Sequence, residues 1–584
     1  MRGIATRAAF AAVLCATFAL AHGDDESMDM DMHMDKAVNM NTPQPSVSPQ
    51  PSAEGPMSYF AHGKHQNTIL AHVGLMVAAW CFVLPAAVML SIARSRFALP
   101  SQFLFSLCNA FGLLLGIIYN SQTPDLYENN AHHKIGWVAT WVVSVQLVLG
   151  MIFTYAGRGE PKTKSSSFER AAFLPVATED HEHVFPTGPM HNYRWSRDSG
   201  QGTEPDSPNH SPSSPSCEPE DYDGFEKPEE DLPRSADSRG WLQSTFVDRF
   251  LSNRVPGMVS NRVLRIFHFV YKVIDRIVLP FGFIAIATGA VTYGGIMRKR
   301  EIFNGLAHFI KGGIFFWYGI LTLGRYVGCW ADLGWAWNRK PSASIVGSWK
   351  SKVPSGEFTE SFVIFFYGIT NVFLEHLSNW GQAWSATDLE HVSISILFFG
   401  GGLAGMLFES KRIREALNNT ILRYPGHGTR DEGWQLPKSQ GVSLNPMPAL
   451  IIMLLGMMMG SHHQTSMTST MVHKQWGNML VGFALARGVT YILLFLRPPT
   501  SYLPARPPSE IVAAFCLMSG GLIFMLSTRN VIEAMEYYEL DAMFTFTVGL
   551  GFTAFIMALE ILAIALKAWA VKREHPPQLT YQFP

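Results

Sequence analysis

The apolar stretch Ile-Leu-Ala-His-Val-Gly-Leu-Met-Val-Ala-Ala-Trp, residues 69–80, decides how this chain folds. It belongs to a longer apolar run over residues 67–93, which as a helix is long enough to cross the ~30 Å hydrocarbon core of a bilayer. His72 interrupts the run, and an ionisable ring in such a segment is costly unless it faces a partner, a ligand or water. The stretch therefore predicts a membrane helix that carries a functional imidazole.

Ten further apolar runs follow the same pattern. They cover residues 102–120, 134–156, 266–296, 303–324, 357–378, 392–408, 446–461, 475–496, 509–527 and 541–569. Of the 584 residues, 48% are hydrophobic, and they gather into runs too long for an ordinary soluble core. We expect an all-α, polytopic membrane helix bundle of about eleven spans in a lipid bilayer. The net charge of -1 argues against a nucleic-acid partner.

The polar segments divide the chain further. Arg2 and Arg7, an apolar stretch and Ala19-Leu20-Ala21 predict a secretory signal peptide over residues 1–21. Residues 157–261, rich in Ser, Pro, Asp and Glu, cannot bury enough apolar area to fold, which predicts a disordered cytosolic insertion. The remaining parts are a disordered Met/His/Asp-rich tail (22–62), helices one to three (63–156), a fourth core helix (262–296), a C-terminal membrane domain (297–570) and a cytosolic tail (571–584).

The basic residues predict the orientation of the chain. With a non-cytosolic N-terminus, the cytosolic loops carry Arg94 and Arg96, Arg339 and Lys340, Lys411, Arg412 and Arg414, Arg497 and Arg506, and, after the last helix, Lys572 and Arg573. This agrees with the positive-inside rule and predicts a cytosolic C-terminus. Arg298-Lys299-Arg300 falls on the opposite side and breaks the pattern. We expect a membrane of the secretory pathway, the plasma membrane, or a vacuolar or endosomal membrane.

Histidines begin the first and the third of these helices. His72 and the pair His132-His133 are separated by one intervening span, which puts them at the same membrane face. Two facing imidazoles can hold one haem iron. The alternative is that these rings only form hydrogen bonds to neighbouring helices inside the bundle.

The front helices also resemble the membrane core of the cytochrome b-561 family. The first reads His72-x-x-x-Met76-x-x-x-Trp80, and the third has His132-x-x-x-Gly136. In that family four consecutive helices each supply one histidine, and the first helix pairs with the third and the second with the fourth. The resemblance implies a haem b between His72 and His132 near the non-cytosolic face.

The same resemblance assigns further haem ligands on the third and fourth helices but none on the second. It makes His133 the alternate ligand on the third helix and His268 the ligand on the fourth. The second helix departs from the pattern, because residues 102–109 contain no histidine where the cytosolic-side ligand belongs. The resemblance therefore supports one haem site and puts a second in doubt.

The back half of the chain has its own polar set near the ends of its helices. Six histidines fall at the non-cytosolic face in the expected topology: His308, His376, His391, His462, His463 and His473. Imidazoles with nearby carboxylates suit copper, iron or zinc. The alternative is that helix ends normally carry polar residues at the membrane interface.

The N-terminal tail alternates thioethers with carboxylates. Its candidate metal ligands are Met28, Met30, Met32, His33 and Met34, a set that suits loose copper capture. Over this short stretch it resembles the methionine motifs of copper importers. A solvated acidic tail is the alternative.

The order of these parts resembles the fungal Ytp family of transmembrane proteins. We expect an integral membrane redox protein, of metalloreductase type if it is an enzyme, that couples a haem b and an unidentified electron donor to copper or iron ions outside the cytosol. Two other classes stay open. One is a haem-free transporter or channel for metal ions or protons, and the other is a non-catalytic scaffold that works through residues 157–261.

Overall fold

The computed structural model describes residues 58–156, 261–299, 301–374, 383–384, 386–422, 437–461, 464 and 466–574. Within these ranges every regular element is a helix, which confirms the expected fold class. The predicted signal peptide, nearly all of the Met-rich tail and the acidic insertion lie outside the described residues.

The front of the chain forms four long helical stretches. They are α3 (Gln66–Val77), which continues through a π-helical turn (Ala78–Val83) into α4 (Leu84–Ile92), then α5 (Ala98–Gln122), α6 (Ala131–Ala156) and α8 (Asn261–Gly294), after the short α2 (Tyr59–His62). The π-helical turn stands directly before Pro85. Proline has no N–H to donate, so a local change in the helical hydrogen-bond pattern accommodates it.

The back of the chain supplies the other long helices. They are α9 (Glu301–Val327), α12 (Gly356–Leu374), α13 (Ala386–Glu409), α15 (Met447–Ser461), α16 (Met467–Leu496), α17 (Ser509–Leu526) and α19 (Ala542–Glu574). Shorter helices lie between them: α10 (Ala343–Val346), α11 (Ser348–Ser351), α14 (Lys411–Leu422) and α18 (Arg529–Tyr537).

Each of the eleven expected apolar runs corresponds to one long helical stretch. Among the described residues, nine of these stretches are long and apolar enough to cross a membrane. The other two are α12 and α15, and α15 has only 15 residues. Many apolar side chains on the nine are exposed, which is the expected condition of surfaces that face lipid.

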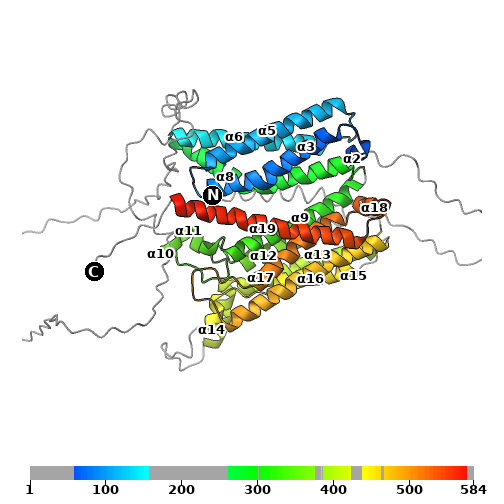
Figure 1. The fold of residues 1–584 in the computed structure, drawn as a ribbon. Helices are drawn as coiled ribbons and strands as arrows, with labels where there is room; N and C mark the ends of the chain where they lie inside the picture. The colour runs from blue at the N-terminus through cyan, green and yellow to red at the C-terminus, as the bar shows by residue number, and fades with distance from the viewer. Residues whose placement is uncertain are drawn as a thin grey trace, which may run out of the picture. The chain divides into compact units, whose positions relative to one another are not determined.

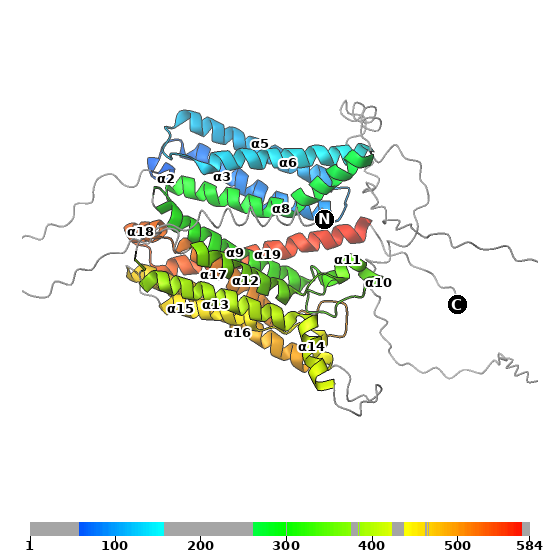
Figure 2. The ribbon, with the colours of Figure 1, turned by 180° about the vertical axis from the view of Figure 1, so that it is seen from behind.

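The helices pack in two groups joined by α19. In the front group α3 and α4 lie against α5, and α6 lies against α8 (Figure 1). In the back group α17 packs against α9 and α16, and α13 against α12 (Figure 2). Helix α19 contacts both α4 and α17, and Leu90 and Ala93 form a small buried cluster with Ala570.

Glycines let the back helices approach closely. A methyl group added at Gly312 of α9 would lie 2.6 Å from the carbonyl oxygen of Gly521 on α17. Gly456 of α15 and Gly477 of α16 meet in the same way, with 2.6 Å from an added methyl at Gly456 to the Gly477 oxygen. Small residues at helix crossings are the usual way in which membrane helices gain packing contacts.

The basic triplet that broke the charge pattern has a structural role. The guanidinium of Arg298 donates to the carbonyl of Leu126 at 2.7 Å and lies 5.0 Å from the centre of the Tyr127 ring. The Tyr127 hydroxyl donates in turn to the carbonyl of Ile296 at 2.7 Å. Arg298 therefore ties the loop after α5 to the loop after α8, so its position follows from a specific contact rather than from membrane charge.

Candidate functional site

Two of the sequence-predicted histidines face each other in the front helices. The imidazole of His72 on α3 and that of His132 on α6 have ring centres 6.5 Å apart, with planes inclined by 78°. Nδ1 of His72 lies 2.7 Å from the carbonyl oxygen of Gly112 on α5, and Nδ1 of His132 lies 3.0 Å from that of Ala285 on α8. All four long helical stretches of the front group thus hold this one pair.

Glycines on the neighbouring helices make room for both rings. A methyl group added at Gly116 of α5 would lie 3.0 Å from Cε1 of His72, and one added at Gly289 of α8 would lie 3.0 Å from Cε1 of His132. Such distances are shorter than ordinary carbon contacts, so a side chain at either position would push the imidazole away. The two glycines therefore fix where the rings can lie.

The donor set could bind a metal through one nitrogen of each ring. Because a carbonyl oxygen engages Nδ1 of His72 and of His132, Nε2 is the nitrogen of each ring that is available to a metal, and a backbone partner on the other nitrogen is the usual arrangement in metal-binding histidines. An ion bound by both Nε2 atoms at about 2 Å lies between ring centres about 6 Å apart, close to the observed separation. No three His, Cys, Asp or Glu side chains in the described part of the chain converge to hold a metal ion. A group that brings its own equatorial nitrogens suits such a pair.

The two other sequence-predicted haem ligands lie against aromatic rings. His133 is exposed, and its ring centre is 6.5 Å from that of Trp137 on the same helix. The ring of His268 on α8 packs edge to face against Phe153, with the centres 5.8 Å apart. Of the adjacent pair on α6, it is therefore His132 whose ring is turned toward His72.

A polar network occupies the region of the front helices around Gln102, where the resemblance called for a histidine. Asp275 on α8 accepts a hydrogen bond from Ser91 Oγ at 2.8 Å and another from Gln146 Nε2 at 2.5 Å. The Tyr271 hydroxyl accepts from Gln102 Nε2 at 2.7 Å and lies 2.9 Å from Ser91 Oγ. Hydrogen bonds join these five side chains, although Oε1 of Gln102 is buried without a partner in the described chain. The missing histidine is thus replaced by an amide that is part of a hydrogen-bonded cluster.

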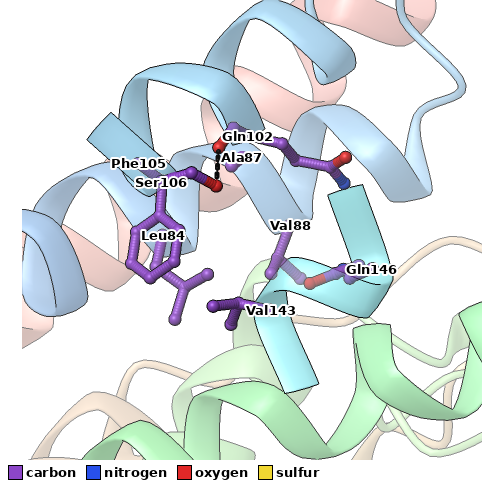
Figure 3. A pocket seen from close by; sticks show the side chains of 8 residues that line it. All are labelled: Leu84, Ala87, Val88, Gln102, Phe105, Ser106, Val143 and Gln146. Carbon is purple, nitrogen blue, oxygen red and sulfur yellow. Dashed lines mark hydrogen bonds between the residues drawn. The ribbon is translucent and has the colours of Figure 1, made fainter. Parts of the chain in front are cut away.

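A small pocket adjoins this network. Its lining, drawn in Figure 3, combines the amides of Gln102 and Gln146 with apolar side chains of α4, α5 and α6. Figure 3 also shows Ser106 donating to the carbonyl of Gln102, at 2.9 Å. Because Phe105 and Val143 fill most of the surroundings, the pocket is mainly an apolar gap beside the two amides.

A second pair of imidazoles lies in the back helices. The ring centres of His308 on α9 and His473 on α16 are 6.2 Å apart, with planes inclined by 90°. Nδ1 of His308 is 2.8 Å from the Asn304 carbonyl, and Nδ1 of His473 is 2.8 Å from the Ser469 carbonyl. The geometry thus repeats that of the front pair, although the carbonyls here come from the preceding turn of the same helix.

Aromatic side chains surround the second pair. Phe524 of α17 has its ring centre 5.4 Å from that of His308, and it stacks on Trp476 at 4.2 Å. Trp476 is fully buried. The second pair is therefore enclosed by aromatic side chains of α16 and α17.

The other sequence-predicted metal ligands stay predictions. His391 lies near the start of α13, and no group of three metal-ligating side chains includes it among the described residues. The remaining ones lie outside the described residues: Met28, Met30, Met32, His33, Met34, His376, His462 and His463.

Sequence reasoning missed a chain of buried charges in the back helices. Arg325 at the end of α9 bonds Glu357 at 2.6 Å and Glu360 at 2.5 Å, both on α12. Arg487 of α16 lies 3.3 Å from Glu360 and, through Nε, 2.7 Å from Glu510 of α17. Removing an ion from water costs several kcal/mol even after relaxation, so such a cluster persists only where the partners compensate one another.

Two family models match different parts of the chain, and the match to the C-terminal part begins within α8. Residues 281–568 match the family model described as "Protein YTP1-like, C-terminal". Residues 53–156 match the model of a domain of unknown function, DUF2427. No solved structure matches the chain.

Fungal relatives extend the match over most of the sequence. An uncharacterized membrane protein of Schizosaccharomyces pombe is 33% identical over 516 residues, which is 88% of this chain and 96% of the relative. A second uncharacterized membrane protein, from Saccharomyces cerevisiae, is 42% identical over 314 residues, 52% of this chain and 47% of the relative. Protein YTP1 of the same yeast is 25% identical over 275 residues, 47% of this chain and 49% of the relative. The expected resemblance to the Ytp family is thereby confirmed, and the chain belongs to the YTP1-like family of membrane proteins.

Proposed function

We propose that this protein is an integral membrane redox protein that holds one haem b between His72 and His132 and transfers electrons linked to copper or iron outside the cytosol. The observation that carries the proposal is the facing pair of imidazoles, 6.5 Å apart, each with Nδ1 at a backbone carbonyl. The resemblance of the front helices to the cytochrome b-561 core supports the same assignment.

The side chains of the front helices would bind and orient the group. The carbonyls of Gly112 and Ala285 fix the tautomer of each ring, so that Nε2 carries the lone pair toward the metal. Gly116 and Gly289 set the position of each imidazole by excluding any bulkier neighbour. A bound haem would supply one-electron chemistry, and His72, His132 and the burial of the site would tune its potential.

The pair His308 and His473 supports the link to copper or iron. Two imidazoles with no third protein ligand in the described residues suit a metal of low coordination number, and imidazole nitrogen suits copper. The tail ligands Met28, Met30 and Met32 would present the same metal from the N-terminal side. In this proposal the N-terminus is non-cytosolic and the C-terminus cytosolic, in a membrane reached through the secretory pathway.

Absorption spectroscopy of the purified full chain tests the haem. We expect a reduced-minus-oxidised spectrum of a b-type haem, lost in His72→Ala and in His132→Ala. The matched control is His133→Ala, which removes the adjacent exposed imidazole and leaves the pair intact. A chain without a haem spectrum, or a spectrum that His72→Ala leaves unchanged, refutes the proposal.

Metal analysis of the same preparations tests the copper or iron step. We expect one equivalent of metal that His308→Ala and His473→Ala each remove while the spectrum of the front pair persists. Reduction of the bound metal after reduction of the haem supports coupling between them. Haem without any retained copper or iron restricts the proposal to electron transfer.

A transporter for metal ions or protons is the second candidate function. The observation that favours it is the buried charge chain in the back helices, because ionisable groups within membrane segments commonly mark ion pathways. Uptake of metal ions or protons into proteoliposomes in the absence of any reductant would support it. Transport that requires a reductant would instead support the redox protein.

A further inference from the structure

The buried charges of the back helices form one unbranched chain of five groups. The order is Glu357, Arg325, Glu360, Arg487, Glu510, and each contact between successive groups is 2.5–3.3 Å long. The exposed fraction of every side chain is below a tenth, and that of Glu510 is zero. The five groups therefore share their charges with one another rather than with bulk water.

Aromatic and backbone groups close the chain on its sides. The face of Trp337 lies 4.3 Å from the Arg325 guanidinium and 5.5 Å from that of Arg487. Arg325 also donates through Nε to the carbonyl of Trp335 at 2.6 Å, and Arg487 donates to the Tyr318 hydroxyl at 3.5 Å. Both arginines are thus held in place by neutral groups in addition to the carboxylates.

A loop covers the end of the helices at which this chain lies. The backbone N–H of Arg339 donates to the Ser501 carbonyl at 2.9 Å, and the Asn338 side chain donates to the Tyr502 carbonyl at 2.7 Å. These bonds fasten residues 329–340, which include Trp335 and Trp337, to the segment between α16 and α17. The cover separates the charges from solvent at the membrane face where α9 and α16 end.

The formal charges of the chain do not balance. Three carboxylates face two guanidinium groups, and arginine does not lose its proton in proteins. Arg325 pairs with both Glu357 and Glu360, and Arg487 lies between Glu360 and Glu510, so three carboxylates share two cations. The three carboxylates cannot all stay ionised cheaply around two cations at this burial, because the uncompensated charge has no water around it.

Several buried polar atoms beside Arg487 lack partners. Apart from the ion pair, neither oxygen of Glu510 has a hydrogen-bond partner within the described chain, and the same is true of Arg487 Nη2 and the Tyr491 hydroxyl. Buried polar groups are nearly always satisfied, so unsatisfied ones point to a proton or an ordered water at that place. They gather at the end of the chain where the negative charge is in excess.

We propose that Glu360 and Glu510 form a proton-binding site in which the two carboxylates around Arg487 share a single proton. The proton belongs to the pair, as in other coupled carboxylates, and internal water completes the hydrogen bonds of the unpartnered atoms. The titratable and charged groups around the pair are Arg325 and Tyr318 of α9, Glu357 of α12, Arg487 and Tyr491 of α16, and, one step outward through Ser355, Glu409 of α13. This site is independent of any haem.

Infrared difference spectroscopy of the full chain in detergent at neutral pH tests the site. We expect the wild type to show the C=O stretch of a protonated carboxyl group, sensitive to D₂O, that is absent in Glu360→Gln and in Glu510→Gln. In either variant two carboxylates face two guanidinium groups, so no excess negative charge is left for a proton to neutralise. Glu533→Gln is the matched control, because Glu533 is an exposed carboxylate in an ion pair with Arg529.

Thermal unfolding of the same variants supplies the second measurement. Glutamine resembles the protonated carboxyl, so Glu360→Gln and Glu510→Gln are expected to melt within ~2 °C of the wild type, which corresponds to a small change in stability. Arg487→Gln leaves two carboxylates without their cation and is expected to melt far lower. Both glutamine variants melting far below the wild type, or both keeping the protonated band, would overturn the proposal. A melting temperature that rises with added sodium or potassium, without a protonated band, would assign the site to a metal cation and overturn it too.

Discussion

Gly312 of α9 offers the sharpest test of the packing, because its neighbour Gly313 serves as a matched control. A methyl group added at Gly312 would lie 2.6 Å from the Gly521 carbonyl and 3.0 Å from the Met525 nitrogen, both backbone atoms of α17. The same methyl at Gly313 would meet only Phe283, at 3.6 Å, an ordinary van der Waals distance. Backbone cannot rotate away as a side chain does, so Gly312→Ala forces the two helices apart.

The expected loss of stability is obtained by comparing Gly312→Ala with Gly313→Ala, because the effects that the two substitutions share cancel. Both substitutions remove a glycine from the same helix, so each gains the same helix propensity, about 1 kcal/mol. Overpacking costs ~1–3 kcal/mol and applies to Gly312→Ala alone. We therefore expect Gly312→Ala to be about 2 kcal/mol less stable than Gly313→Ala, which lowers its melting temperature by ~2–3 °C relative to that control.

Thermal unfolding of the detergent-solubilised chain, followed by circular dichroism, measures this difference. A size-exclusion profile before heating shows whether each variant is folded and monodisperse. Equal melting temperatures for the two variants would refute the close approach of α9 and α17 at Gly312. A lower melting temperature for Gly313→Ala than for Gly312→Ala would mean that α17 contacts α9 on the face of Gly313.

Three further expectations follow from other contacts. Gly477→Ala on α16 would push its methyl against the backbone of α15, whereas Gly488→Ala meets no atom within 4 Å, so the first should melt ~2–3 °C below the second in the same assay. Burial raises the pKa of the Cys329 thiol, so its alkylation by a maleimide at pH 7 should be slower than that of a small free thiol and should speed up as the pH rises, as measured by mass spectrometry. Trp80→Phe removes the 3.0 Å hydrogen bond from the indole to Asn109 and leaves a buried amide unsatisfied, which should cost about 1–3 kcal/mol in denaturant unfolding.

Hydropathy alone is sufficient to find the helices. A segment that crosses the bilayer must form all its backbone hydrogen bonds internally, so a long apolar run predicts a helix. Because successive spans run in opposite directions, the sequence also places His72 and His132 at one face of the membrane. It favoured His132 and kept His133 as the alternate only through the family resemblance, because the direction of each ring depends on how α6 rotates against α8. The carbonyl of Ala285, which lies 3.0 Å from Nδ1 of His132, holds that ring on the side of His72.

The buried charge chain escaped sequence reasoning for a different reason. Four of its members stand near helix ends, where arginine and glutamate usually meet water, and the positive-inside rule treats arginine there as a surface residue. Only Arg487 carried a readable signal, because it lies far from both ends of its apolar run, 475–496. Its carboxylate partners come from α12 and α17, and no spacing in one sequence predicts such a contact.

Helices α9 and α16 connect the two kinds of chemistry that this molecule places in its back half. Each carries an imidazole of the second pair near its beginning, His308 or His473, and an arginine of the charge chain toward its end, Arg325 or Arg487. At 1.5 Å per residue the two groups on α9 are about 25 Å apart, most of the thickness of the hydrocarbon core. The proposed metal site and the proposed proton site are therefore too far apart to share a ligand. Loss of one should leave the other intact unless the two helices move as rigid rods.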